Sequence, residues 1–109
     1  MLDFVYLMEY IKAMKRLEKT DEYHHWFDAL TDKLVKARIQ ARIDRLQEGN
    51  AGDVEPVGEG VSELKLHFGS GWRIYFIERS SDIVILLAGG HKKTQKRDIK
   101  LALELARNL

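Results

Sequence analysis

The fold is decided by residues 61–93, which read VSELKLHFGSGWRIYFIERSSDIVILLAGGHKK. Polar and apolar residues alternate over 63–68 and again over 72–76, and this is the period of a half-buried β-strand. The three residues 69–71 between the two runs predict a hairpin turn. We expect the hairpin to fold symmetrically about Ser70.

The predicted hairpin has one apolar face and one polar face. The polar face carries Lys65 and His67 opposite Tyr75 and Arg73. A lysine, a histidine, an arginine and a tyrosine therefore meet on one sheet surface, and the function depends on what this cluster binds. The apolar, core-facing side chains are Leu64, Leu66, Phe68, Trp72, Ile74 and Phe76.

The length and composition predict one ordinary globular domain. A chain of 109 residues with 45% hydrophobic and 32% charged residues is long enough to bury a core without covalent staples. The sequence contains no cysteine, which excludes a disulfide framework, a thiolate metal site and a cysteine nucleophile. This composition fits a reducing compartment, and we expect a cytoplasmic protein.

The basic charge is concentrated in one part of the chain. The net charge is only +1, yet residues 64–97 hold seven Lys or Arg against two acids, together with two histidines. Such a local excess favours a polyanionic partner. A solvated, lysine-rich surface explains the excess of charge equally well.

The N-terminal residues 1–13 are interpreted as an extension of a main domain at 14–109. Asp3 and Glu9 interrupt their apolar pattern, no basic segment precedes it, and it is too short to span a membrane. Apolar residues at helical spacing predict a short helix. Alternatively, Met14 is the natural first residue and the extension is a mis-set start of the reading frame.

The rest of the chain predicts an α+β fold. Residues 14–19 form either a loop or an edge strand. Two helices follow, one capped by Thr20 or Asp21 and one from 31 to about 48, and they form a helical hairpin. A loop at 51–60, the hairpin strands, a strand at 83–87 and a helix at 95–108 complete the order. We expect a small antiparallel sheet of three to four strands with the helices packed on one face.

Metal and serine chemistry are disfavoured by the spacing of the candidate residues. His24 and His25 are adjacent, so on a helix they point about 100° apart and do not easily share one ion. The Gly69–Gly71 segment is better explained as a turn than as a nucleophile elbow, and no Gly-Lys-Ser/Thr follows it to form a phosphate-binding loop. We expect neither a metal nor another cofactor.

Metal-free cleavage of RNA remains compatible with these residues. The reaction needs a base for the 2′-hydroxyl, an acid for the leaving 5′-oxygen and cations for the phosphorane oxygens, while RNA itself supplies the nucleophile. The catalytic candidates are Lys65, His67, Arg73, His91 and Lys92. Each of them is also explained as an ordinary solvent-exposed residue.

The same stretches resemble a known family. Residues 49–64 (GNAGDVEPVGEGVSEL), 69–76 (GSGWRIYF), 83–90 (IVILLAGG) and 92–95 (KKTQ) resemble the RelE/ParE toxin superfamily, in particular its HigB-like addiction module killer branch. The resemblance extends from about Lys15 to the C-terminus.

The resemblance implies a RelE-like fold and the toxin of a type II toxin–antitoxin system. It implies cleavage of mRNA in the ribosomal A site and inhibition by a small helix-turn-helix antitoxin. By motif position Arg73 and Lys92 match family residues, and Lys65 stands where the branch usually has a basic residue. His91 departs from the acid that is usual there. The expected RNA-binding residues are Tyr75, as a stacking surface, and Lys93, Lys96, Arg38 and Arg42.

Two other functions stay open from the sequence. A ParE-like toxin with the same fold poisons DNA gyrase instead of cutting RNA. A non-catalytic module that binds nucleic acid or an antitoxin would carry the same basic surface.

Overall fold

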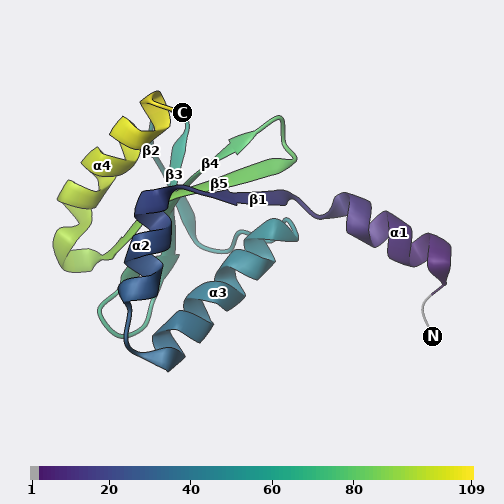
Figure 1. Cartoon of the computed structure of the whole chain (residues 1–109), viewed down its shortest axis with the longest axis horizontal. Helices are drawn as coiled ribbons and strands as arrows, with labels where there is room; N and C mark the ends of the chain where they lie inside the picture. The colour runs from purple at the N-terminus through teal and green to yellow at the C-terminus, as the bar shows by residue number, and fades with distance from the viewer. Residues whose placement is uncertain (1–2) are drawn as a thin grey trace.

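The structure, a computed structural model, describes residues 3–109 and places one five-stranded sheet between helices on both faces (Figure 1). The strand order is β1-β5-β4-β3-β2. In chain order the elements are α1 (Phe4–Ala13), β1 (Arg16–Lys19), α2 (Asp21–Ala29), α3 (Lys33–Gln47), β2 (Val54–Gly58), β3 (Val61–Leu66), β4 (Trp72–Arg79), β5 (Ile83–His91), the short 3-10 helix η1 (Lys92–Thr94) and α4 (Gln95–Arg107).

The β3–β4 hairpin has the predicted faces but a different register. Lys65 pairs with Arg73 and Leu66 with Trp72, so the hairpin is centred on Gly69 rather than on Ser70. A shift of two residues keeps every side chain on its face because the side-chain period of a strand is two. The connection is longer than predicted because β3 ends at Leu66.

The strand β5 lies in the interior of the sheet and is covered on both faces, as its continuous apolar sequence predicts. Its register with β4 shifts by one residue after Tyr75, which leaves Leu87 as an extra residue. The Thr20 hydroxyl, which caps α2 by accepting from the Tyr23 amide, also donates to the Leu87 carbonyl at 2.6 Å. The bulge and the α2 cap are thus fixed by one side chain.

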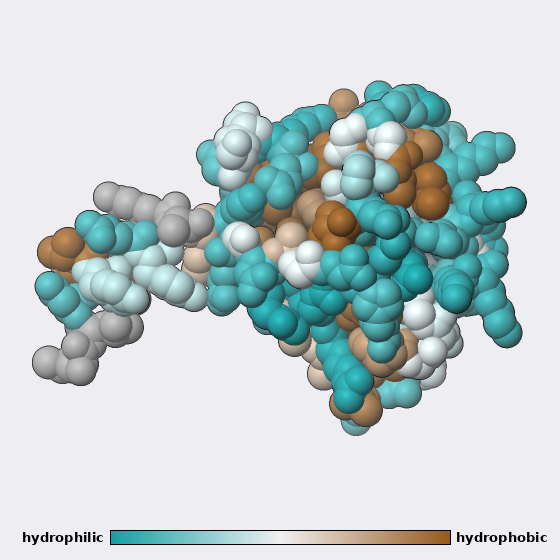
Figure 2. Space-filling model, turned by 180° about the vertical axis from the view of Figure 1, so that it is seen from behind, coloured by the Kyte–Doolittle hydropathy of each residue, from teal (hydrophilic) through white to brown (hydrophobic). Residues whose placement is uncertain are grey.

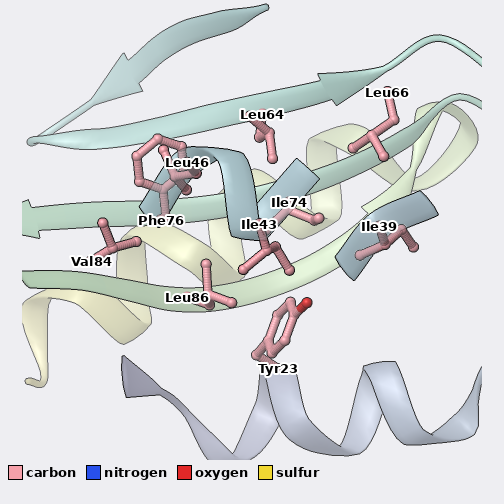
Figure 3. Packing of buried hydrophobic residues seen from close by; sticks show 10 residues of the cluster. All are labelled: Tyr23, Ile39, Ile43, Leu46, Leu64, Leu66, Ile74, Phe76, Val84 and Leu86. Carbon is pink, nitrogen blue, oxygen red and sulfur yellow. The ribbon is translucent and has the colours of Figure 1, made fainter. Parts of the chain in front are cut away.

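One face of the sheet packs against α2 and α3, which form the predicted helical hairpin (Figures 1 and 3). Thr20 and Asp32 cap the two helices close to the predicted positions. The buried side chains between this face and the two helices form one cluster. It is apolar except for the phenol of Tyr23, whose pKa is raised by burial. Its buried members are Tyr23, Ile39, Ile43, Leu46, Leu64, Leu66, Ile74, Phe76, Val84 and Leu86.

The other face packs against α4, so the prediction that all helices lie on one face is wrong. The α4 helix begins at Gln95 as predicted, and its buried Ala102 contacts the second apolar cluster. The physical reason is that Tyr75, on the polar face of the hairpin, is large enough to serve as core once a helix covers it. The buried members of this cluster are Val61, Tyr75, Ile85, Leu87, Ala88 and Ala102.

Two glycines in β5 allow the helices to approach the sheet on both sides. A Cβ added to Gly89 would overlap the indole of Trp26 from α2, and one added to Gly90 would overlap the carboxylate of Asp98 from α4. The Asp98 side chain is buried and accepts a hydrogen bond from the Thr94 hydroxyl at 2.5 Å. The Gly-Gly pair therefore positions both helices.

The two edge strands add to the predicted sheet, and one of them makes it a mixed parallel and antiparallel sheet. The stretch left open as a loop or an edge strand is β1, which pairs parallel with β5. The strand β2 lies inside the predicted loop 51–60 and contains Pro56, which is tolerated at a sheet edge because the missing N–H is not needed there. The sheet thus has five strands where three to four were expected.

The helix predicted in the N-terminal extension is present as α1, which stands clear of the body (Figures 1 and 2). Its apolar side chains are largely exposed; Phe4, for example, retains 72% of its accessible surface. The Tyr10 hydroxyl donates to Glu48 at the end of α3. Among residues 3–109 no helix has the length and hydropathy needed to cross a membrane.

The close approach of Asp98 to Gly90 predicts a large effect of a single methyl group. Gly90→Ala should destabilise the protein by about 1–3 kcal/mol, because β5 and α4 must move apart to admit the added Cβ. Urea unfolding of Gly90→Ala, Asp98→Ala and the double variant measures the coupling between the two positions. Simple additivity of the two effects would contradict the assigned packing.

Candidate functional site

A cavity of about 400 Å³ lies at the turn end of the β3–β4 hairpin. It combines the turn itself with one side chain from β4 and one from η1. Its lining residues are His67, Phe68, Gly69, Ser70, Gly71, Arg73 and Lys92. Three of the five predicted catalytic residues are therefore brought together here: His67, Arg73 and Lys92.

Arg73 is the buried cation of this cavity. Its side chain lies on the α4 face of the sheet, and the residue retains 7% of its accessible surface. One guanidinium nitrogen donates to the carbonyl of Trp72 at 3.2 Å, while Nε is buried without a hydrogen-bond partner. Within residues 3–109 no carboxylate forms an ion pair with Arg73. A buried cation in this state is costly, and an anion entering the cavity would relieve the cost.

Gly71 brings Lys92 next to Arg73. Its φ of +74° suits glycine, and a Cβ at this position would lie 3.3 Å from Cβ of Lys92 and 3.7 Å from a guanidinium nitrogen of Arg73. The Lys92 amide also donates to the carbonyl of Ser70. The turn, β4 and η1 are thus held together around the two cations.

Lys65 and His67 differ from Arg73 because each is paired with a carboxylate. The Lys65 ammonium donates to Glu55 on β2 at 2.8 Å, and this hydrogen bond raises the pKa of Lys65. The His67 Nε2 contacts the carboxylate of Asp53, and this bond lowers the pKa of Asp53. Lys65 is the cross-strand partner of Arg73 but does not line the cavity.

The prediction that Tyr75 offers a stacking surface is wrong. The ring is completely buried beneath α4, so no base can reach it. Its hydroxyl donates to the buried Glu63 at 2.8 Å, and burial together with this carboxylate raises the pKa of Tyr75. The Gln95 amide donates to both oxygens of Glu63, at 3.1 and 2.8 Å. Tyr75 therefore belongs to a buried polar network that ties β3 and β4 to the start of α4.

The remaining predicted residues lie outside this cavity. His91 pairs with Trp72 across β4 and β5, and its ring packs edge-on against the indole with 6.0 Å between the centroids. Lys93 and Lys96 are exposed on η1 and α4. Across the described part of the chain, no three His, Asp or Glu side chains gather as a metal-binding group.

A second cavity of about 300 Å³ lies between α3 and the same hairpin turn. It contains the predicted RNA-binding residues Arg38 and Arg42. Arg42 is half-buried and donates to the carbonyls of Lys65 and Ala51 at 2.9 and 3.0 Å, so it braces α3 against β3. The lining residues are Arg38, Ala41, Arg42, Arg45, Leu66, His67 and Phe68.

Sequence reasoning missed the carboxylates that surround the site. The sequence predicts a loop at Asp53 and Glu55, and only the pairing of β2 with β3 brings them beside His67 and Lys65. The alternating pattern predicts that Glu63 lies on the polar face of its strand. In the structure α4 packs over this face, and Glu63 is buried. The resemblance of the Lys-Lys-Thr-Gln segment to the family includes Gln95, but nothing in the sequence identifies Glu63 as the partner of Gln95.

The comparisons with known proteins agree with this architecture. Residues 25–108 match the model of the family described as phage derived protein Gp49-like (DUF891). The chain belongs to this family. An uncharacterized protein of Haemophilus influenzae is 43% identical to this Gp49-like chain over 94 residues, which cover 86% of the chain and 95% of that protein.

Among solved structures, the free state of a mutant of the Escherichia coli toxin RelE is similar to the Gp49-like chain. The TM-score is 0.61 at 13% sequence identity, and the match covers 80% of this chain and 96% of RelE. A likeness at this identity establishes the fold. The predicted RelE-like α+β fold is therefore confirmed.

The buried network predicts that Tyr75→Phe destabilises this Gp49-like protein by about 1.5–3 kcal/mol, because it removes a hydrogen bond to a buried carboxylate. The matched control is Tyr10→Phe, which removes a hydroxyl that donates to the exposed Glu48 and should change stability little. Urea unfolding measures both variants. Equal effects in the two variants would contradict the assigned burial.

The pairing of Asp53 with His67 predicts a pH dependence. Because His67 lowers the pKa of Asp53, this pair stabilises the fold above the ordinary aspartate pKa, and the contribution disappears as the pH falls through the lowered value. In His67→Ala the Asp53 midpoint, followed by carboxyl-carbon NMR, should rise toward the ordinary value. His25→Ala should leave it unchanged, and a midpoint insensitive to His67 would refute the pairing.

Proposed function

We propose that this chain is the toxin of a type II toxin–antitoxin system and acts as a metal-independent endoribonuclease on mRNA at the ribosome. The observation that carries the proposal is Arg73, which lines the cavity at the hairpin turn and has no carboxylate partner among the described residues. The RelE-like fold and the Gp49-like family agree with a toxin.

Arg73 is suited to hold the scissile phosphate. A guanidinium binds two phosphate oxygens with parallel N–H donors, and the strength of this interaction grows when water is excluded. Its fixed position in β4, opposite Gly90, means that little reorganisation is needed as charge develops on the phosphorus oxygens. Lys92 adds a second positive charge, since its side chain and the Arg73 guanidinium both lie next to Gly71.

His67 is the best placed group for proton transfer. Its Nε2 is engaged by Asp53, which orients the ring and leaves Nδ1 as the nitrogen that exchanges a proton with RNA. In the proposed step the 2′-hydroxyl loses its proton to His67 and its oxygen attacks phosphorus. The bond from phosphorus to the 5′-oxygen then breaks, and Lys92 protonates that oxygen. The products are a 2′,3′-cyclic phosphate and a 5′-hydroxyl.

The other predicted residues take supporting roles in this proposal. Lys65 contributes positive charge beside Arg73 while its ammonium stays with Glu55. His91, Lys93 and Lys96 are left for contacts outside the cavity, with the flanking backbone or with ribosomal RNA. The cognate helix-turn-helix antitoxin, by this proposal, covers the cavity or holds the chain away from the ribosome.

The proposal predicts that Arg73→Ala abolishes growth inhibition when the chain is expressed without an antitoxin. Arg73→Lys should restore little activity, because a lysine cannot bind two phosphate oxygens in the same bidentate way. The control is Arg79→Ala, which removes an exposed arginine at the far end of the same strand. Primer extension on cellular mRNA after induction measures cleavage directly. Full cleavage by a folded Arg73→Ala variant would overturn the assignment.

The same experiment separates the other toxin mechanisms. Discrete mRNA cuts near codon boundaries support the proposed nuclease. A DNA-damage response without mRNA cuts would instead indicate a gyrase poison, and normal growth with neither signal would indicate a non-catalytic binding module. Each of these two results rejects the nuclease.

A further inference from the structure

The second cavity, between α3 and the hairpin turn, has a specific composition. Arg38, Arg42 and Arg45 stand three and four residues apart, so they form one stripe along α3, and Ala41 lies within it. The stripe faces His67 and Phe68 of the turn. The three arginines of α3 therefore form one wall of the cavity.

The charges on this wall are not balanced within the protein. Arg42 is held by two backbone carbonyls, and its pKa is lowered by burial and then by the positive charge of Arg45. In the described part of the chain, neither Arg38 nor Arg45 forms an ion pair with a carboxylate. An anion between these arginines would remove the repulsion.

An aromatic ring completes the cavity. The guanidinium carbon of Arg38 lies over the ring of Phe68, 4.8 Å from its centroid. A guanidinium stacked on an aromatic ring is a planar surface whose other face accepts a nucleobase. Phe68 is only partly buried, at the edge of the α2–α3 cluster. The cavity therefore offers a flat surface beside unbalanced positive charge.

The two cavities are neighbours, because His67 and Phe68 line both of them. We propose that the second cavity is a nucleotide-binding subsite for single-stranded RNA, in which the base stacks on Arg38 and Phe68 while its phosphate contacts Arg45. This inference rests on the proposed function, since it places the nucleotide next to the phosphate that Arg73 holds. His67 then lies between the two nucleotides, where the proton transfer occurs.

The arrangement favours RNA over an acidic protein segment. An acidic peptide needs cations alone, whereas stacking on the Arg38–Phe68 pair requires a planar ligand. The hydrogen bonds from Arg42 to the carbonyls of Lys65 and Ala51 hold α3 at a fixed distance from β3, and this distance sets the width of the cavity. Gly52 permits this brace, because an added Cβ would lie 2.7 Å from the Arg42 guanidinium.

The test is direct binding of a fluorescent 2′-O-methyl RNA hexanucleotide, which lacks the nucleophilic hydroxyl and cannot be cut. Anisotropy titrations at several salt concentrations compare the full chain with its variants. Arg38→Gln/Arg45→Gln should weaken binding and reduce the salt slope by about 0.7 for each phosphate that the protein no longer neutralises. Phe68→Leu should weaken binding about fivefold or more with an unchanged slope, and Phe68→Trp should retain it.

Arg79→Gln, at an exposed position far from the turn, is the control for removal of a positive charge. Circular dichroism confirms that each variant is folded. Arg73→Ala is titrated in parallel, so that the two cavities are judged separately. If Arg73→Ala weakens binding and the Arg38/Arg45 variant does not, the subsite is rejected while the nuclease proposal stands. If only the Arg38/Arg45 variant weakens binding, the subsite stands and Arg73 loses its assigned role.

An octaglutamate peptide serves as the competing probe. Octaglutamate should displace the RNA poorly, since it cannot stack. Displacement at equal concentration, together with unchanged RNA binding by Phe68→Leu, would overturn the subsite in favour of an acidic protein partner.

Discussion

The packing of two helices against one pair of glycines is the constraint on which the rest of the structure depends. Gly89 admits Trp26 on one face of β5, and Gly90 admits Asp98 on the other. Any side chain at either position would push a helix away from the sheet. Opposite Arg73, which pairs with Gly90, the space that a β5 side chain would fill is taken by Thr94 of η1 and Asp98 of α4. The two glycines thus set how closely α2 and α4 approach the strand that pairs with the Arg73 strand.

The polar face of the hairpin is divided into two parts by α4. Beneath the helix, Tyr75, Glu63 and Gln95 satisfy one another and act as core. Beyond the start of α4, Arg73 is buried without a carboxylate partner among the described residues. Lys65 and His67 are instead paired with Glu55 of β2 and with Asp53, which precedes β2. The division separates residues that stabilise the fold from residues that have capacity left for a ligand. It explains why one alternating strand supplies both.

The sequence predicts the elements better than their partners. Side-chain period locates the hairpin faces and α4, and capping residues help to locate α2 and α3, because these signals are local. The hairpin register, the coverage of Tyr75 and the carboxylate partners of Lys65 and His67 are set by contacts between distant segments, which periodicity does not encode. Of the predicted catalytic set, His67, Arg73 and Lys92 line one cavity, while Lys65 and His91 do not. The strand β2 escaped prediction because its proline and the glycines at its end and on either side of it are typical of loops.

The pairing of cations with carboxylates decides how the cluster is to be understood. Had all the cationic groups been neutralised internally, the surface would be a set of structural ion pairs, which contribute little when exposed. The pairs that exist are exposed on the carboxylate side and lie at the rim, whereas the enclosed guanidinium has only a backbone carbonyl. Pairs of this kind can exchange a carboxylate for a phosphate at small cost, since the carboxylates are largely exposed to solvent. The buried guanidinium of Arg73 has no carboxylate to release, so the whole attraction between it and a bound anion contributes to the binding free energy. This electrostatic asymmetry is the reason why we propose Arg73, rather than Lys65 or His67, as the centre at which a polyanion is held.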